Sequence, residues 1–543
     1  MATVLGLHGG YSVQQHDAAA VLIRDGVVVA AIEEERLYRQ KGANGLLPIE
    51  ATAACLVEAG IGLDEVDLIV MPGSTYEDAI PRAHSWLRHH FGTHPEVITI
   101  NHQEAHLHSS FWQSPFERSL CVSFDAYGDR LSGAIATGSR REGIKVLETR
   151  PHDNSLGVFY GTMTSFLGFK PGEDEFKVMG LAAYGDEVLD LGFFLRTSKD
   201  GYYCDPSFAR DEVRASQFEP HYSERLVDRL GAPRLRGEPL NERHIILARS
   251  TQQALETSIQ SLIRYAISEF GTDEEIATNM CLSGGVALNC SANGSLLGSG
   301  AIKNLFVAPA ASDRGLALGC AFAGANALND VIQAPNSQFL GPSVSAARIE
   351  QALQLSGIRH RSLEDPAEVA SSLIAQGKVV GWFQGRSEYG PRALGARSVL
   401  ANPCDPEMKD RINAKIKFRE EFRPFAPAVT EEASGTYFQM YEHSSPAMTV
   451  AFPTSDASVR EILPATTHVN DTARVQTVSA EISPDLHRLL LFLQRETGHP
   501  VALNTSFNIK GQPIVESALE ALSTFASTGM DALVIGPFLV EKP

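Results

Sequence analysis

The chain has 543 residues and a formal net charge of −19, with 46 Lys and Arg against 65 Asp and Glu. A chain of this length predicts two domains, and its hydrophobic content of 43% is typical of a folded globular protein. The acidic balance argues against broad binding to nucleic acid or to anionic membranes, because both polyanions repel it.

Cysteine usage and hydropathy indicate a cytoplasmic protein. The seven cysteines are scattered and form no CxxC pair, which indicates reduced thiols rather than a disulfide framework or a zinc knuckle. The amino terminus has no signal-peptide pattern, and no run of about 18 apolar residues predicts a membrane span.

The first 140 residues contain two similar strand patterns. Apolar residues 4–7 and 18–23 flank a glycine-containing loop, and the Arg24-Asp25-Gly26 turn predicts a hairpin that returns as a strand over 27–32. A related strand, Gly/Asp loop and strand recur over 120–137. The repetition predicts a duplicated α/β unit.

Composition places the boundaries of the predicted domains. Residues 186–245 are polar and irregular with several prolines, and we interpret them as an insertion over the core. Residues 333–345 are rich in Pro, Gly, Ser and Asn, which is typical of a linker. We therefore predict a first domain over 1–335, a linker over 336–345 and a second α/β domain over 346–543.

Three acidic residues followed by three basic ones form a charge run from Glu33 to Lys41, after the first hairpin. Such a run is usually a solvated surface, but a lysine placed here could instead reach phosphate in a cleft. His16, in the preceding loop, could then serve as a base.

His102 and His106 are four positions apart, so a helix would bring both imidazoles to one side, one turn apart. Asp125 ends an apolar strand and Asp313 lies in a glycine-containing loop, and the two could complete a four-ligand set. Two histidines and two aspartates suit Fe(II), Mn(II) or Zn(II) better than a soft metal. From the spacing alone, a pair of surface histidines without metal is the commoner meaning.

Gly284 and Gly285 follow an apolar strand and precede a helical stretch. Paired glycines let the backbone approach a ligand, and a helix N-terminus offers N–H groups to phosphate. The loop, with Asn289, is therefore a nucleotide-binding candidate, although a tight turn without ligand explains it equally well. Lys177, just before a second glycine-containing segment, is a weaker candidate of the same kind.

The second domain carries positive residues among apolar ones. Arg392 follows Pro391, which suits the first turn of a helix, so an anion could meet N–H groups and a guanidinium there. The other members of the group are Lys417, Arg423, Arg474 and the amide Asn504. The group predicts a pocket for a small dianion with an amide-like end, and a basic surface paired with Glu420 and Glu421 is the alternative.

Six motifs in this chain occur in the order in which one known family has them. They are His16-Asp-Ala-Ala-Ala, Glu33-Glu-Glu-Arg, His102-x-x-x-His106, Lys177-Val-Met-Gly-Leu-Ala, Ser283-Gly-Gly-Val-Ala-Leu-Asn and Gly390-Pro-Arg-Ala-Leu-Gly. Over nearly its whole length the chain resembles the O-carbamoyltransferases, among them nodulation-factor enzymes and an antibiotic-tailoring tobramycin enzyme.

The resemblance implies an α/β fold in two parts. An actin-like (ASKHA) duplicated domain, similar to the threonylcarbamoyl-transfer proteins, would be followed by a YrdC-like domain. By residue match the implied metal ligands are His102, His106, Asp125 and Asp313, and the implied catalytic residues are His16 and Lys41. Those implied for carbamoyl phosphate are Arg392, Lys417, Arg423, Arg474 and Asn504.

Two positions depart from the family pattern. Asp125 is followed by Ala126 where a glycine is usual, and Asp313 is followed by Arg314 where an apolar residue is expected. An alanine at position 126 argues against close contact between the backbone of that loop and a phosphate. The role of Asp125 as a metal ligand does not depend on residue 126.

The resemblance also implies a reaction. Carbamoyl phosphate and ATP would give carbamoyl adenylate, and the carbamoyl group would pass to a hydroxyl of a small natural-product or sugar-derived acceptor. Fe(II) is the metal that the family favours, with Mg(II) accompanying ATP, and a homodimer is compatible with the family. The alternatives are an actin-fold kinase with Asp125 as base, and a tRNA-modifying protein of the threonylcarbamoyl type.

Overall fold

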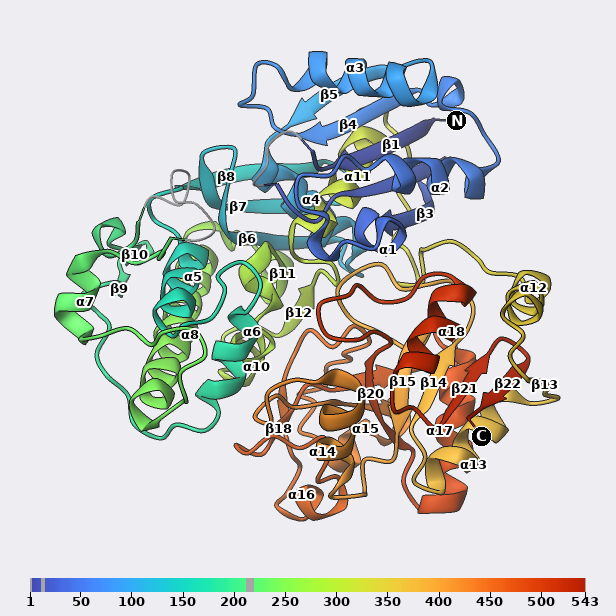
Figure 1. The fold of residues 1–543 in the computed structure, drawn as a ribbon. Helices are drawn as coiled ribbons and strands as arrows, with labels where there is room; N and C mark the ends of the chain where they lie inside the picture. Colours follow the sequence, from blue (N-terminus) through green and yellow to red (C-terminus); the bar gives the residue numbers. More distant parts are fainter. Residues whose placement is uncertain (1, 11–14, 211–218, 543) are drawn as a thin grey trace.

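The computed structural model of the protein describes residues 2–10, 15–210 and 219–542. Its N-terminal region, up to residue 335, contains two five-stranded sheets, and its C-terminal region contains one eight-stranded sheet (Figure 1). Every strand predicted in the first 140 residues is present.

The first sheet has the strand order β3-β2-β1-β4-β5. Its strands are β1 (Thr3–His8), β2 (Ala19–Arg24), β3 (Val27–Glu33), β4 (Leu68–Pro72) and β5 (Glu96–Ile100). The first three form an antiparallel meander, and β4 and β5 are added in parallel. The helices α2 (Ile49–Ala59) and α3 (Ala79–Phe91) belong to this half.

The second sheet repeats this order as β8-β7-β6-β11-β12, so the predicted duplication is confirmed. Its strands are β6 (Arg118–Gly128), β7 (Leu131–Ser139), β8 (Gly143–Pro151), β11 (Asn279–Ser283) and β12 (Asn304–Val307). Again three strands are antiparallel and two are parallel additions. The repeated sheet is the actin-like arrangement that the resemblance implied.

Two helices form the layer between the sheets. Both α4 (His102–Gln113) and α11 (Leu316–Ala327) are buried along almost their whole length, and α11 packs on β1, β4 and α4 (Figure 1). Such burial requires small residues: a Cβ at Gly319 would lie 1.8 Å from the carbonyl oxygen of Ala105. The layer matters for function because α4 begins at His102 and α11 follows Asp313.

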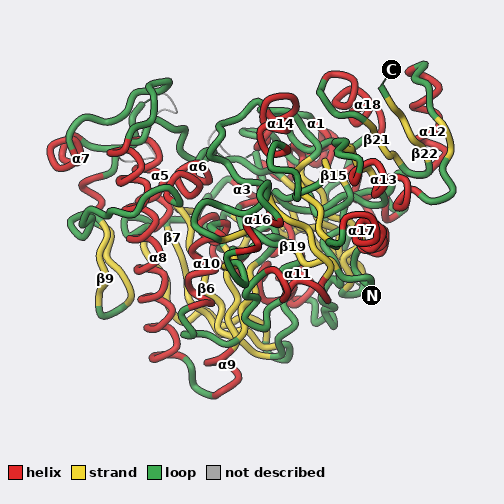
Figure 2. Tube along the Cα trace, turned by 90° about the horizontal axis from the view of Figure 1, so that it is seen from below, coloured by secondary structure: helices red, strands yellow, loops and turns green. Residues whose placement is uncertain are grey.

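The predicted insertion over 186–245 is more regular than its composition indicated. It contains a hairpin of β9 (Leu195–Ser198) and β10 (Gly201–Cys204) and the helix α7 (Glu224–Leu230). The hairpin packs on the long helix α8 (Glu242–Phe270), and Figure 2 shows both at one side of the molecule. Part of the segment, 211–218, lies outside the described residues.

The C-terminal region is built on a mixed sheet of order β13-β22-β21-β14-β15-β20-β16-β19. The strands are β13 (Arg361–Ser362), β14 (Val380–Phe383), β15 (Arg397–Ala401), β16 (Ala426–Thr430), β19 (Gln476–Val478), β20 (Val501–Ser506), β21 (Ala532–Ile535) and β22 (Phe538–Glu541). The accompanying helices include α12 (Ala346–Ser356), α13 (Pro366–Ala375), α17 (Pro484–Thr497) and α18 (Ala518–Ser527). Its YrdC-like character stays a prediction.

The first four residues of the charge run, 33–36, are not a solvated surface, and that interpretation was wrong for them. Glu33, Glu34, Glu35 and Arg36 are all buried. Glu33 accepts the N–H of Gly390 at 2.7 Å, and Arg36 donates to the carbonyl of the same glycine at 2.8 Å. Glu33 and Arg36 are tolerated because they pair with each other at 3.6 Å and with the backbone of Gly390 across the contact between the two regions.

The linker segment 336–345 is also fixed to both regions. The carbonyl of Leu340 accepts the backbone N–H of Ala31 at 2.9 Å and a guanidinium N–H of Arg386 at 2.8 Å. Arg386 further donates to the carbonyl of Val29 on β3. The connection therefore adds to the interface instead of acting as a free tether.

Candidate active sites

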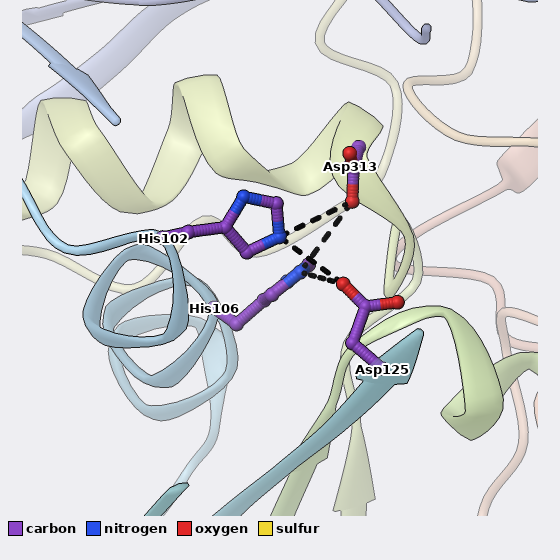
Figure 3. A group of neighbouring side chains, drawn as sticks. All are labelled: His102, His106, Asp125 and Asp313. Carbon is purple, nitrogen blue, oxygen red and sulfur yellow. Dashed lines mark hydrogen bonds and ion pairs between the residues drawn. The ribbon is translucent and has the colours of Figure 1, made fainter. Parts of the chain in front are cut away.

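Four side chains converge at the predicted metal site (Figure 3). The Nε2 atoms of His102 and His106 lie 3.1 and 3.3 Å from Oδ2 of Asp125, and 3.5 and 3.6 Å from Oδ1 of Asp313. One potential ligand atom from each residue lies within 4.8 Å of the others. His106 is 0% exposed and His102 only 7%, so the alternative of a surface histidine pair was wrong.

The start of α4 is held in place by two side chains. Asn101 caps the helix by accepting the N–H of Gln103 at 2.9 Å, as its residue type and position favour. Asp129 accepts the N–H of His102 at 2.8 Å and that of Gly73 at 3.0 Å. The helix that carries both imidazoles is thereby fixed to the loop that follows β4.

Asp125 uses its two carboxylate oxygens differently. Oδ2 points to the histidines, whereas Oδ1 accepts the N–H groups of Ala126 at 2.8 Å and Gly285 at 3.2 Å. Ala126 has a negative φ, so the backbone does not need the glycine that the family usually has there. The glycine loop thus touches a metal-ligand candidate directly.

His102 and Asp125 stabilise each other's charge. Burial opposes a charged imidazole, but Asp313 and Asp125 outweigh it and raise the pKa of His102 to about 10. Burial likewise opposes a charged Asp125, and the hydrogen bonds from the two histidines hold its pKa below the usual range. Two imidazole nitrogens and two carboxylate oxygens in a buried cluster are a donor set that fits a divalent cation.

Gly284 gives the glycine loop its conformation. It has a φ of +88°, and a Cβ there would lie 2.2 Å from the carbonyl oxygen of Phe124. We expect Gly284→Ala to lower the free energy of unfolding by about 2–4 kcal/mol, measured by urea denaturation, because both the φ and the contact must change. Gly60→Ala is the control: its φ is +66° in open space, and it should cost only about 1 kcal/mol. Equal losses would contradict a steric role for Gly284.

The other nucleotide candidates have protein partners. Asn289 caps α10 (Cys290–Gly298), accepts the N–H of Ala292 at 3.0 Å, and exchanges amide hydrogen bonds with Gln252. Lys177, on α6 (Glu175–Ala182), pairs with Asp174 at 2.9 Å and with Glu420 of the C-terminal region at 3.1 Å. The structure therefore places Lys177 at the contact between the regions, and its nucleotide role stays a prediction.

The loop around Arg392 is not the start of a helix, which corrects the prediction from Pro391. Residues 391–396 are irregular because Glu388 accepts the N–H groups of Leu394, Ala396 and Arg397 through one oxygen. Sequence reasoning missed Glu388; the signal was an acid inside an otherwise basic loop. The Glu388 carboxylate fixes the segment that carries Arg392 through these three hydrogen bonds.

Arg392 itself has no hydrogen bond or ion pair to any described residue. Burial and the neighbouring Arg474 lower the pKa of Arg392 to about 9, and Arg314 and Arg423 act in the same direction. The buried Nε of Arg474 also lacks a partner. Guanidinium groups gathered without a counter-charge are costly unless an anion binds between them.

The remaining members of the predicted anion pocket are more fully bonded. Buried Lys417 donates to Asn508 Oδ1 at 2.8 Å and to Ser506 Oγ at 3.1 Å. Arg423 lies 3.6 Å from Glu420, whose other partner is Lys177. The alternative of a surface paired with acids therefore describes Arg423 in part, but not Arg392 or Arg474.

Asn504 is hydrogen-bonded to the loop that carries Arg392. Its amide nitrogen donates to the carbonyl of Ala393 at 3.1 Å and to Oε1 of Gln476 at 2.7 Å, while its Oδ1 is buried without a partner. A buried amide oxygen without a protein partner, on a side chain that contacts the loop of Arg392, is suited to accept an N–H group from a ligand.

Lys41 of the N-terminal region lies close enough to Lys417 of the C-terminal region to disfavour its positive charge. Burial, then Arg419 and Arg423, and finally Lys41 hold the pKa of Lys417 well below its usual range. Lys41 is exposed, and its neighbour Gly42 donates to Glu35 at 2.6 Å. Arg419, which sequence reasoning missed, stacks on Phe425 at 4.1 Å. The predicted catalytic lysine thus lies on the side of the anion pocket.

Most of the chain matches the models of one family. Residues 5–84 and 82–322 match the family described as Carbamoyltransferase N-terminus, and residues 371–542 match Carbamoyltransferase C-terminus. The chain belongs to the carbamoyltransferase family. The resemblance drawn from the six motifs is thereby confirmed, and this carbamoyltransferase is an enzyme. The exact domain boundaries stay a prediction, although the uncovered stretch 323–370 includes the predicted linker.

Relatives of this carbamoyltransferase align over most of its length. Nodulation protein NolNO of Sinorhizobium fredii is 37% identical over 589 residues, covering 99% of this chain and 82% of that protein. The 3'-hydroxymethylcephem-O-carbamoyltransferase of Streptomyces clavuligerus is 27% identical and covers 92% of each chain. Among solved structures, the ROK hexokinase of Thermus thermophilus is 15% identical over 61% of this chain and 100% of its own, with a TM-score of 0.32, too low for further inference.

Family membership decides between the activities that the sequence left open. A carbamoyltransferase passes a carbamoyl group from a donor to an acceptor, whereas the kinase alternative would transfer a phosphoryl group and the tRNA-modifying alternative a threonylcarbamoyl group. Among the described residues, no helix is both long and apolar enough to cross a membrane. A homodimer stays a prediction.

Proposed function

We propose that this carbamoyltransferase is ATP-dependent and acts on a hydroxyl group. Water hydrolyses carbamoyl phosphate to carbamate and phosphate. Carbamate attacks the α-phosphorus of ATP to give carbamoyl adenylate and pyrophosphate, and an alcohol then displaces AMP. The observation that carries the proposal is the group of unpaired guanidiniums at Arg392 and Arg474. A pocket of this kind is suited to a phosphate dianion.

The C-terminal pocket would bind the donor through complementary groups. Arg392 and Arg474 would pair with the phosphate, assisted by Lys417 and Arg423. The free Oδ1 of Asn504 would accept an N–H of the carbamoyl group. Because carbamate and acyl adenylates react with water, keeping bulk water away from these groups would favour transfer over hydrolysis.

The N-terminal site would receive the adenylate. A divalent cation held by His102, His106, Asp125 and Asp313 would supply Lewis-acid and template chemistry at the phosphate oxygens. Fe(II) is our preferred metal, with Mn(II) or Zn(II) as substitutes and Mg(II) accompanying ATP. The N–H of Gly285 and the helix N-terminus at Asn289 would face the nucleotide.

His16 would take the proton of the acceptor hydroxyl, and Lys41 would neutralise developing negative charge. The His16 side chain is 45% exposed, so an acceptor can reach it. Partial desolvation opposes a charged imidazole, but Asp17 and more weakly Asp313 and Asp125 raise the pKa of His16 to about 9. Cation charge at the two metal-ligand carboxylates would cancel part of this field and bring the pKa down towards the range of a base.

The acceptor is proposed to be a small natural-product or sugar-derived alcohol. The name of the Streptomyces clavuligerus relative specifies an O-carbamoyl transfer to a hydroxymethyl cephem, and the Sinorhizobium fredii relative is a nodulation protein. Carbamoylation replaces H by CONH₂, so mass spectrometry of an acceptor panel would identify the substrate by its mass gain.

The nucleotide product tests the proposed chemistry. With ATP, carbamoyl phosphate and Mg²⁺ or Fe²⁺, we expect AMP and pyrophosphate, both dependent on carbamoyl phosphate, because carbamate attacks the α-phosphorus. Separation of the nucleotides by ion-exchange chromatography measures this. Formation of ADP without carbamoyl phosphate would refute the proposal, since that product belongs to a kinase.

A further inference from the structure

Asp17 lies between the candidate base and the loop that carries a metal-ligand candidate. Its Oδ1 accepts the guanidinium of Arg314 at 2.9 Å, and its Oδ2 accepts the hydroxyl of Ser312 at 3.0 Å. The same Oδ2 lies 3.5 Å from Nδ1 of His16. A three-residue stretch, 312–314, therefore contributes Asp313 to the metal site and fixes Asp17 with its two flanking side chains.

Asp17 is built into the structure as a buried anion. Asp17 is 7% exposed, and its φ of +62° is a left-handed backbone conformation that is strained for residues other than glycine. Burial opposes its charge, but Arg314 and His16 hold the pKa of Asp17 below its usual range. The fold therefore keeps a strained, buried carboxylate at the point where it contacts the His16 imidazole.

The backbone of His16 is fixed from the opposite side. Buried His8, at the end of β1, has its Nε2 3.0 Å from the carbonyl of His16 and 3.7 Å from Oδ2 of Asp313. The His16 imidazole is thus held at its backbone by His8 and at Nδ1 by Asp17. Nε2 remains as the ring nitrogen that can accept a proton from a substrate.

The guanidinium of Arg314 is paired with two carboxylates of the protein, so it is not available to bind a substrate. Besides Asp17 it pairs with Glu35 at 3.1 Å, and its carbonyl accepts the hydroxyl of Tyr389 from the C-terminal region. Both acids, with burial opposing them, raise the pKa of Arg314 above its usual value. The resemblance leads us to expect an apolar residue at position 314. The arginine found there is instead neutralised by two acids of the protein itself.

We infer that Asp17 and Arg314 are positioning residues for His16 in the transfer half-reaction. Arg314 fixes the Asp17 carboxylate, and Asp17 orients the imidazole with Nδ1 protonated and Nε2 free, as in other aspartate–histidine pairs. The proton of the attacking hydroxyl then passes to Nε2, its oxygen bonds to the carbamoyl carbon, and the bond from that carbon to the AMP oxygen breaks. The inference rests on the proposed function.

Three measurements separate the two half-reactions. Carbamoyl-phosphate-dependent exchange of pyrophosphate into ATP reports formation of carbamoyl adenylate alone. AMP release with water as the hydroxyl nucleophile reports transfer that needs a base, and hydroxyurea formed from hydroxylamine reports transfer to a neutral amine that needs less help. All three use the full chain loaded with Fe²⁺ or Mn²⁺.

For Asp17→Asn we expect exchange and hydroxyurea formation within a few-fold of the parent enzyme, with AMP release into water lowered about 100-fold. Arg314→Met should show the same pattern, and Arg314→Lys should restore part of the rate with water because one charged contact to Asp17 can re-form. Asp78→Asn, a surface aspartate paired with Arg82, is the control and should leave all three rates unchanged.

The outcomes are distinguishable. Equal losses in all three reactions, or loss of bound metal by elemental analysis, would mean that Asp17 only holds the loop together, and the inference would be overturned. Unchanged release of AMP into water would overturn it as well. Absence of pyrophosphate exchange in the parent enzyme would instead refute the proposed function, and the inference with it.

Discussion

His106→Ala should remove the metal from the protein and abolish carbamoyl transfer. The His106 imidazole is fully buried, and its Nε2 lies within 3.6 Å of both aspartates, so alanine removes a nitrogen ligand from the centre of the set. Removing an outer partner of a metal ligand already costs about 10–100-fold in metal affinity, and loss of a ligand should cost at least as much. Elemental analysis after dialysis measures the metal content.

His108→Ala is the matched control for this experiment. His108 is buried on the same helix, but its Nδ1 accepts the indole N–H of Trp112 at 3.0 Å, away from the two aspartates. We expect this variant to retain its metal even where it loses some stability. Full metal content in His106→Ala would exclude His106 from the site.

Arg392→Ala should abolish turnover of carbamoyl phosphate and leave nucleotide binding intact. Loss of one partner from a buried charge pair costs about 2–5 kcal/mol, which corresponds to a decrease of about 30-fold or more. Steady-state release of pyrophosphate measures turnover, and calorimetry measures nucleotide binding. Arg411→Ala, whose arginine pairs with Asp531 at 2.6 Å near the surface, should keep its activity.

The same Arg392 variant should not be less stable than the parent. Burial and Arg474 disfavour the charged form of Arg392 and lower its pKa to about 9, so its removal relieves repulsion in the ligand-free protein. Urea denaturation should give an equal or higher free energy of unfolding, and carbamoyl phosphate should raise the Tm of the parent more than that of the variant. A large loss of stability would show that Arg392 is a structural residue.

Local patterns were sufficient for the duplicated sheet and for the metal-ligand candidates. Strand alternation around the Arg24-Asp25-Gly26 turn, and its recurrence after residue 120, depend on the side chains of each segment alone. The spacing of His102 and His106 is likewise a property of one helix. These features are local, and the structure has them where the sequence indicates.

Contacts between distant segments could not be read in the same way. Glu33 and Arg36 look like a solvated charge run until Gly390, more than 350 positions away, supplies their backbone partners. The helix expected at Arg392 does not form because Glu388 takes the N–H groups of the loop. In both cases the deciding hydrogen bonds exist only in the folded chain.

By itself, the sequence determined an acidic, two-part α/β chain with one cationic group in its second half, and its motifs determined the resemblance to O-carbamoyltransferases. Only the tertiary structure decided which charges are free. Arg314 and Lys177 are paired with acids, whereas Arg392 has no partner among the described residues. The reason is physical: whether a buried charge is balanced by the protein or left for a ligand depends on neighbours that only folding brings within a few ångströms.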